Sequence, residues 1–175
     1  CQALKNQYGF DAISLMPTNL YGPKDNYDLN DSHVMAALIR KFYDAKLKDK
    51  KEVVCWGSGK PLREFLYVDD LAEACFFLLN KWDPNKNNSP VDENGLPLNW
   101  INVGCNFEIS IKDLAKKISE IIGYKGEILW ESCKPDGTPR KKLDTSCIQK
   151  LGWQAKTDLD NGIRYTIESY KKDLP

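Results

Sequence analysis

The 175-residue chain carries 25 basic and 25 acidic side chains, so its formal net charge is zero. Hydrophobic residues make up 42% of it and charged residues 29%, a balance typical of a folded globular protein and not of a disordered one. A nucleic-acid-binding protein usually carries a basic excess, and no apolar run here reaches the length of a membrane span. We therefore expect neither nucleic acid nor a membrane among its partners.

The N-terminal part of the chain predicts a helix, a strand and a second helix. Residues 1–8 (CQALKNQY) have the pattern of the end of an amphipathic helix, and Gly9 is a typical C-terminal stop. No initiator Met or helix cap precedes them, so we expect the chain to be part of a longer protein, cut inside that helix. Residues 12–16 predict a buried strand, and a loop rich in Pro, Asn and Gly follows from residue 17. The next helix has an N-terminal cap at Asp31 or Ser32 and an apolar face of Val34, Leu38, Phe42 and Ala45.

The central part of the chain continues the alternation. Residues 52–56 predict a strand, residues 57–61 a turn, and residues 65–68 a short extended segment. Asp70 and Glu73 have the spacing of a capping box, which predicts a helix. The apolar stripe of that helix comprises Leu71, Ala74, Cys75, Leu78, Leu79 and Trp82. The polar segment 83–99 predicts a long surface loop.

The C-terminal part predicts two more strands and three helices. Residues 100–103 form a buried strand closed by Gly104, and residues 127–131 form the other strand. Between them, Ser110 and Asp113 cap a helix that ends at Gly123. A basic loop from Lys134 leads to a short helix ending at Gly152, and the last helix buries Ile163, Ile167 and Tyr170. Alternating strands and helices indicate the α/β class.

Cysteine usage indicates a reducing compartment. The six cysteines form no C-x-x-C pair and stand mostly in apolar surroundings; they are Cys1, Cys55, Cys75, Cys105, Cys133 and Cys147. Scattered cysteines of this kind are usually packing residues and not a disulfide framework or a zinc site. We expect reduced thiols, a cytoplasmic protein and no metal centre.

Two features in the first quarter of the chain are candidates for a cofactor site. The segment LMPTNLYGP (Leu15 to Pro23) follows a predicted strand, and in doubly wound sheets ligands bind beyond the C-terminal ends of strands. His33, the only histidine, stands at the start of a predicted helix, where a neutral imidazole can act as a general acid or hydrogen-bond donor. On the residues alone, a structural turn and a surface histidine remain the more frequent alternatives.

Two further segments are candidates for binding an anionic ligand. WGSGKPLREF (Trp56 to Phe65) combines an aromatic ring with an arginine that can hold a phosphate through two hydrogen bonds. KPDGTPRKK (Lys134 to Lys142) offers several cations for a diphosphate, and Asp136 can bond a sugar hydroxyl. A hairpin turn and a solvated charged loop are the open alternatives. The chain has no G-x-G-x-x-G after a strand, no Y-x-x-x-K pair and no P-loop spacing.

In this order, these segments resemble the GDP-L-fucose synthase family of extended short-chain dehydrogenases/reductases. The resemblance rests on MPTNLYGP, DSHVMAALIRKF, WGSGKPLREFLYVDDLAEA, INVG, YKG, KPDGTPRKKLD and LGW, and covers nearly the whole chain. YGP and the VDD helix recur across the extended family, whereas NLYGP with SHV and KPDGTPRK are much more specific. The resemblance implies conversion of GDP-4-keto-6-deoxy-D-mannose to GDP-L-fucose by epimerisation at C3 and C5 and reduction at C4 with NADPH.

The same resemblance implies the site residues. His33 takes the place of the family's catalytic histidine, and it lies near the cofactor together with Pro17, Thr18, Asn19 and Leu20. The GDP-sugar contacts match Trp56, Arg63 and Asp136, while Lys41 stands where the family has an arginine and so lacks its two-pronged grip. The family's catalytic cysteine, serine, tyrosine and lysine would all lie upstream of Cys1, so none of the six cysteines takes that role.

The resemblance also implies the architecture. The chain would be the C-terminal substrate-binding part (residues 1–175) of an NAD(P)-binding Rossmann-type enzyme, without its N-terminal dinucleotide-binding half. Residues 10–23 and 65–104 would contribute to the Rossmann sheet and the rest to a smaller substrate lobe. The intact protein would be a homodimer, and the isolated chain would be inactive and bind NADP(H) weakly or not at all. Two alternatives remain: another NAD(P)-dependent nucleotide-sugar epimerase or dehydratase, and a non-catalytic nucleotide-sugar-binding module.

Overall fold

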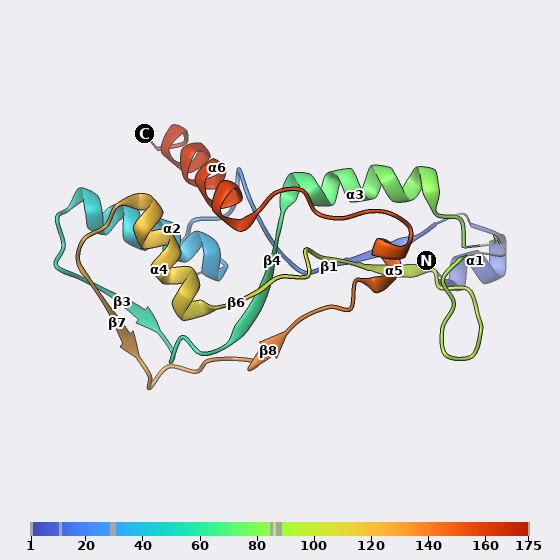
Figure 1. Cartoon of the computed structure of the whole chain (residues 1–175), viewed down its shortest axis with the longest axis horizontal. Helices are drawn as coiled ribbons and strands as arrows, with labels where there is room; N and C mark the ends of the chain where they lie inside the picture. Colours follow the sequence, from blue (N-terminus) through green and yellow to red (C-terminus); the bar gives the residue numbers. More distant parts are fainter. Residues whose placement is uncertain (1, 11, 29–30, 85, 87–88, 175) are drawn as a thin grey trace.

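A computed structural model describes residues 2–10, 12–28, 31–84, 86 and 89–174 of the chain. Helices alternate with short strands, as the α/β class requires (Figure 1). The helices are α1 (Gln2–Tyr8), α2 (Val34–Leu47), α3 (Val68–Lys81), α4 (Ile111–Ile122), α5 (Ser146–Lys150) and α6 (Leu159–Lys172). The strands are β1 (Ser14–Pro17), β2 (Asn19–Tyr21), β3 (Glu52–Trp56), β4 (Leu62–Tyr67), β5 (Trp100–Val103), β6 (Glu108–Ser110), β7 (Glu127–Glu131) and β8 (Arg140–Lys141). None of the described helices has both the length and the apolar character needed to cross a membrane.

Most of the strand pairing is parallel. β1 pairs with β5, β2 with β4, and β3 with β7, all in parallel register. β4 also pairs with β6 in antiparallel register and with β8 in parallel register. Parallel strands need long connections, and α2 or α3 is part of those between the paired strands. Carboxyl ends of paired strands therefore meet, which brings the loops after β3 and β7 together.

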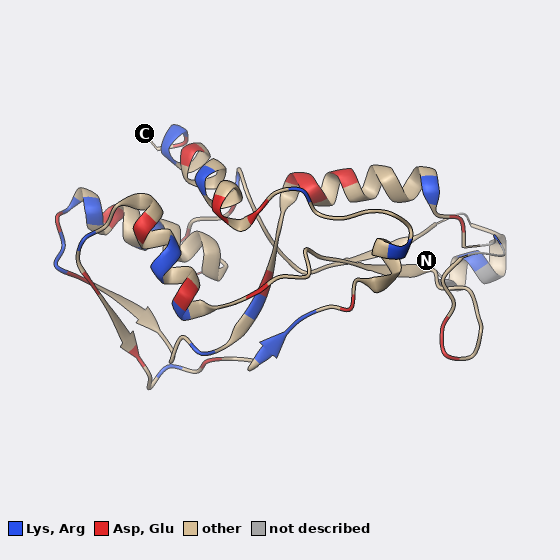
Figure 2. Cartoon of the chain, in the orientation of Figure 1, with Lys and Arg blue, Asp and Glu red and all other residues tan. Residues whose placement is uncertain are grey.

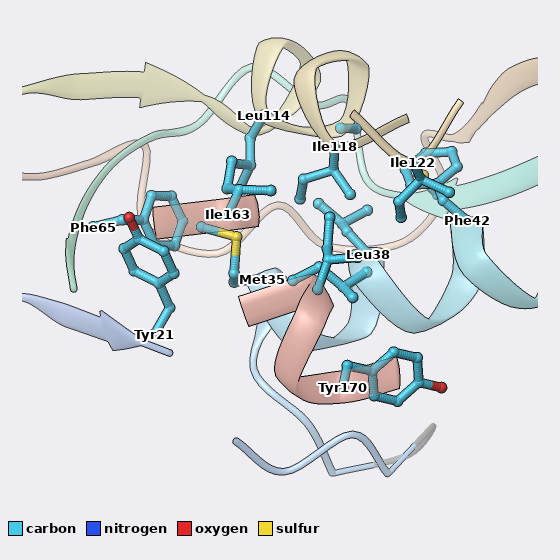
Figure 3. Packing of buried hydrophobic residues seen from close by; sticks show 14 of the residues in the cluster. Tyr21, Met35, Leu38, Phe42, Phe65, Leu114, Ile118, Ile122, Ile163 and Tyr170 are labelled. Atoms are coloured by element: carbon cyan, nitrogen blue, oxygen red, sulfur yellow. The ribbon is translucent and has the colours of Figure 1, made fainter. Parts of the chain in front are cut away.

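Two hydrophobic clusters form the core, and β4 contributes to both. The larger cluster is formed by side chains of α2, α4, α6 and the β3–β7 pair, and Figure 3 shows part of its packing. The smaller cluster joins α3 to β5 and α5. Because side chains alternate across a strand, Phe65 and Tyr67 face the larger cluster while Leu66 faces the smaller one. Full burial of a large apolar side chain contributes about 1.5–3 kcal/mol, so the fully buried Phe42 and Leu78 are major contributors.

Several predicted elements are confirmed. α4 begins after Ser110, whose hydroxyl oxygen accepts the Asp113 N–H, and it ends at Gly123 with φ of 77°. α1 ends at Gly9, whose N–H donates to the Lys5 carbonyl; Cys1 lies outside the described residues. In the predicted surface loop 83–99, the described residues show only an isolated bridge between Val91 and Pro97, and residues 85, 87 and 88 are not described.

The predicted starts of two helices are wrong. α2 begins one residue after His33, which is the N-cap and makes no side-chain capping bond, so neither Asp31 nor Ser32 caps it. α3 begins at Val68 after Tyr67, and its first turn already contains Asp70. The Asp70 carboxylate does not cap the helix, because it accepts two hydrogen bonds from the distant Thr157. A local capping pattern was therefore overridden by a tertiary contact.

The sequence also missed short strands and misplaced two core residues, one of which is Val34, predicted on the apolar face of α2 but 36% exposed. β2 lies inside the loop predicted from residue 17, and its register pairs Asn19 with Phe65 of β4. β6 and β8 are likewise too short to show a period of two, and β4 begins three residues before the predicted segment. Leu79 is 75% exposed and does not belong to the buried stripe of α3. The assignment of residues 10–23 and 65–104 to a Rossmann sheet stays a prediction.

Candidate functional site

Two loops meet at the C-terminal ends of β3 and β7. The register of the pair places Trp56 beside Glu131, and the Gly57 N–H donates to the Glu131 carbonyl at 3.1 Å. Beyond these residues, the Asp136 carboxylate accepts the Ser58 N–H and the Ser58 hydroxyl, both at 2.6 Å. Gly57 has φ of 79°, and a β-carbon there would collide with the Asp136 carboxylate. Glycine is therefore required for this turn to close against the basic loop.

The Asp136 carboxyl is held in its ionised form. Hydrogen bonds from the Ser58 hydroxyl and the Ser58 amide lower the pKa of Asp136, and the Lys60 ammonium lowers it further. Each carboxylate oxygen can accept more than one hydrogen bond, so the contacts with Ser58 leave acceptor capacity for a ligand hydroxyl. The predicted sugar-binding role of Asp136 is therefore compatible with its position, although its contacts in this structure are internal.

Trp56 presents an exposed aromatic face between two cations. The ring is 60% exposed at the end of β3. The Lys41 ammonium lies 5.2 Å from the ring centroid and the Lys134 ammonium 5.5 Å, within the range of cation–π attraction. Lys41 also donates to the Val54 carbonyl at 3.1 Å, which fixes it beside β3. Such an arrangement can stack a planar base and place positive charge beside a phosphate.

Arg63 approaches the same basic loop from β4. β8 pairs with the start of β4, so Arg63 stands opposite Lys141, and Figure 2 shows basic residues on β8 and on the adjoining part of β4. A β-carbon on Gly137 would lie 3.7 Å from Arg63 Nη2, so the guanidinium lies beside that glycine. Arg63 Nη1 donates at 2.8 Å to the carbonyl of its neighbour Leu62. The structure therefore gathers Lys41, Trp56, Arg63 and Asp136 around residues 57–58 and 134–137.

The predicted cofactor segment is fixed to β4 by its side chains. The Thr18 hydroxyl and the Asn19 amide donate to the Glu64 carbonyl at 3.1 and 2.7 Å. Leu20 packs against the smaller hydrophobic cluster, and Pro17 is exposed at the end of β1. Only the exposed parts of this segment can touch a ligand, since three of its four side chains are committed to the fold.

His33 lies at the start of α2, immediately before Val34. It is exposed, and as N-cap its backbone is extended with φ of −68° and ψ of 157°. Its carbonyl accepts the Ala37 N–H at 2.9 Å, but within the described part of the chain no hydrogen bond or ion pair joins its imidazole to residues 17–20. The imidazole is thus free to meet a ligand.

Three residues near the site escaped the sequence analysis. Ser58 was seen only as part of a turn, and Lys134 only as one cation of a loop, because their partners lie far along the chain. Glu64 is completely buried, and the signal for it was a charged residue between the apolar Leu62 and Phe65 of a strand. Across the described residues, His, Cys, Asp and Glu form no cluster of three that could hold a metal ion.

Comparisons with known proteins identify the family of the chain. Residues 1–91 match the NAD dependent epimerase/dehydratase family. The chain is 46% identical to GDP-L-fucose synthase 1 of Arabidopsis thaliana over 174 residues, which cover 99% of this chain and 50% of that protein. It therefore spans about half the length of the curated relatives it matches.

Solved structures show the same fold. A GDP-6-OMe-4-keto-L-xylo-heptose reductase from C. jejuni is 33% identical with a TM-score of 0.86, over 99% of this chain and 57% of that one. A GDP-L-fucose synthetase from Naegleria fowleri, solved with NADP bound, is 25% identical with a TM-score of 0.80, over 98% of this chain and 50% of that one. By its sequence and its fold, the chain belongs to the NAD dependent epimerase/dehydratase family.

Proposed function

We propose that the chain is the GDP-sugar-binding part of a GDP-L-fucose synthase. The intact protein would convert GDP-4-keto-6-deoxy-D-mannose to GDP-L-fucose by epimerisation at C3 and C5 and NADPH-dependent reduction at C4. The observation that carries this proposal is the convergence of Lys41, Trp56, Arg63 and Asp136 at the ends of β3 and β7. The similarity to GDP-L-fucose synthases supports the choice of nucleotide and sugar.

Each of the four proposed substrate residues binds the ligand in its own way. Trp56 stacks on a planar or sugar face, since its exposed ring is the only aromatic surface these four residues offer. Arg63 and Lys41 neutralise the diphosphate, Arg63 with a planar fork and Lys41 with a single ammonium. Asp136 accepts a hydroxyl of the ribose or the sugar through oxygens that Ser58 already orients. The lysine at position 41 predicts a looser diphosphate contact than an arginine would give.

The residues predicted to face NADP(H) fit such a ligand. Pro17 and His33 are exposed, whereas the inward bonds of Thr18 and Asn19 hold the segment after β1 rigid. The carboxyl end of a parallel strand is where dinucleotides bind in folds of this type. When bound, NADPH supplies the hydride for the ketone. His33 is the proton donor of the epimerisation, with its imidazole not used by any helix cap.

The decisive experiment follows NADPH oxidation by the intact protein with GDP-4-keto-6-deoxy-D-mannose and identifies the sugar formed. Stoichiometric oxidation with GDP-L-fucose as product supports the proposal. His33→Asn should then abolish epimerisation while GDP binding persists. A folded protein that oxidises no NADPH with this substrate would refute the substrate assignment.

The nucleotide-binding role is tested separately by titration with GDP. Base stacking on an aromatic ring contributes about 1–3 kcal/mol, so Trp56→Ala should weaken GDP binding by roughly fivefold to 150-fold. Trp100→Ala is the matched control, because Trp100 is also exposed but lies on β5, outside the group of four. Equal effects of the two substitutions would contradict the stacking role.

One related function has its own support. The fold is also that of a C. jejuni reductase named for a GDP-linked keto-heptose, so another GDP-keto-sugar is the second candidate substrate. A panel of GDP- and UDP-linked keto-sugars would separate it from the first.

We further propose a homodimer formed through α1, where Leu4 and Tyr8 are 48% and 71% exposed. The free thiols of the five described cysteines favour the cytoplasm.

A further inference from the structure

Glu64 is a charged side chain in the interior of the protein. It lies on β4 directly after Arg63, and its exposed fraction is 0%. Ionised carboxylates are rarely buried unless hydrogen bonds or cations compensate them. In the described part of the chain no lysine, arginine or histidine forms an ion pair with Glu64, so hydrogen bonds to the main chain compensate it.

The two carboxylate oxygens bind two different segments. Oε1 accepts the Asn106 N–H at 2.7 Å, and Oε2 accepts the Leu143 N–H at 3.3 Å. Asn106 belongs to the turn between β5 and β6 and has φ of 60°, in the left-handed region that asparagine adopts more readily than most residues. Gly104 makes room for the contact, because a β-carbon there would collide with Oε1. The carboxylate thus holds a left-handed turn on one side and a loop on the other.

The second segment is the end of the basic loop of the substrate site. β8 pairs with β4 for two residues, and the Leu62 N–H donates to the Pro139 carbonyl at 2.9 Å. Beyond this short ladder, Glu64 continues the attachment by binding Leu143. An exposed ion pair between Arg140 and Glu108 adds to it, but water and salt screen such a pair. The bond to Glu64 is partly buried, so water and salt screen it less than this exposed pair.

We propose that Glu64 is a positioning residue of the nucleotide-sugar site. By holding the loop 134–143 on β4, its carboxylate sets Asp136 and Gly137 relative to the Arg63 guanidinium. It acts through these neighbours and does not touch the ligand. The inference rests on the proposed function for its effect on the sugar nucleotide, whereas the attachment of the loop can be measured without any ligand.

The carboxylate and the carbonyl of Glu64 serve different segments, and this makes the role testable. Among the described residues, the carbonyl accepts hydrogen bonds from the side chains of Thr18 and Asn19 in the predicted cofactor segment. The carboxylate accepts hydrogen bonds from the main-chain amides of the turn and of the basic loop. Glu64→Gln keeps the shape and the carbonyl but turns an amide N–H toward one of the two donors. Thr18→Val removes only a bond to the carbonyl. The two variants should therefore affect different substrates.

The experiment measures KM and kcat of the intact protein for both substrates. Glu64→Gln should raise the KM for the GDP-sugar about tenfold, equivalent to about 1.4 kcal/mol, with the KM for NADPH within twofold of the original. Thr18→Val should raise only the KM for NADPH. Glu127→Gln, on the exposed start of β7, is the control and should change neither. A merely structural role would lower kcat through loss of folded enzyme and leave both KM values alone.

Amide hydrogen exchange of Asn106 and Leu143 gives the readout that needs no ligand. In Glu64→Gln at least one of the two amides, the one that the new N–H group faces, should exchange at least about tenfold faster, while α4 keeps its protection. If Glu64→Gln does not fold, Gly104→Ala replaces it, because its methyl group displaces the carboxylate without removing it. Unchanged exchange in a folded variant, or unchanged KM values with activity retained, would overturn the proposal. If the original protein does not act on the GDP-sugar, the proposed function fails, and the exchange rates alone decide whether Glu64 holds the loop.

Discussion

The contact between Asp70 and Thr157 ties the two hydrophobic clusters together and should contribute strongly to stability. Asp70 on α3 is 4% exposed; its two oxygens accept the Thr157 N–H at 3.0 Å and the Thr157 hydroxyl at 3.2 Å. Thr157 immediately precedes Asp158, the N-cap of α6, so the contact fixes α6 of the larger cluster to α3 of the smaller one. Hydrogen bonds to a charged group contribute about 1.5–3 kcal/mol each. We expect Asp70→Ala to lower the free energy of unfolding by about 3 kcal/mol.

The isosteric variant separates hydrogen bonding from charge. In Asp70→Asn the amide oxygen can still accept the Thr157 N–H, and the amide N–H can donate to the Thr157 hydroxyl. What is lost is the negative charge in the first turn of α3, worth about 0.3–1 kcal/mol. Urea unfolding monitored by tryptophan fluorescence measures both variants, with Glu73→Gln as control because the interaction that Glu73 makes with the described residues is an exposed ion pair with Lys156. An Asp70→Asn variant as unstable as Asp70→Ala would refute the reasoning.

Three further predictions concern single side chains. Ser58→Ala should raise the pKa of Asp136 toward its ordinary value of 3.8 in a carboxyl NMR titration. Because the folded pKa is depressed, the stabilisation from this contact is present above pH 3.8 and is lost as the pH falls through the folded pKa. An unchanged pKa in the variant would contradict the contact. Cys133 is exposed, whereas burial raises the pKa of Cys55, so a thiol reagent should label Cys133 rapidly and Cys55 only after unfolding; rapid labelling of both in the native protein would contradict the core packing. Lys41→Arg should tighten GDP binding about three- to tenfold in calorimetry of the intact protein, since a guanidinium can make two bonds to a phosphate; weaker binding would show that Lys41 does not face the diphosphate.

The parts of the fold that were predictable are those that neighbouring residues determine. The cap at Ser110 and the stop at Gly123 are both encoded within one stretch of sequence, and the structure confirms them. Asp70 has the same local appearance as a capping residue, but its partner lies 87 residues away. β2 was missed for a related reason. Three residues are too few to show the alternation of a strand, and it is their pairing with β4 that makes them one.

The candidate site shows the same division. Trp56, Arg63 and Asp136 could be selected by residue type and by resemblance, because exposed aromatic rings and cations in loops are recognisable in a sequence. Their arrangement could not be predicted, since the bond that joins the two loops connects Ser58 to Asp136 across 78 residues. Glu64 was overlooked for a physical reason: a buried carboxylate is recognisable only when the main-chain donors that compensate it are known.

The register of β4 decides both the packing and the site. Arg63 faces the basic loop, Glu64 is compensated by two main-chain amides, Phe65 packs in the larger cluster and Leu66 in the smaller one. A slip of one residue would exchange these environments, placing a charge among apolar side chains and an apolar side chain at the site. β2 fixes one edge of this strand, and β6 and β8 pair with its beginning. β2, β6 and β8, with only two or three residues each, are therefore sufficient to keep β4 in register. They have to prevent only a slip that is itself costly, because it would move Glu64 and Leu66 out of their buried environments.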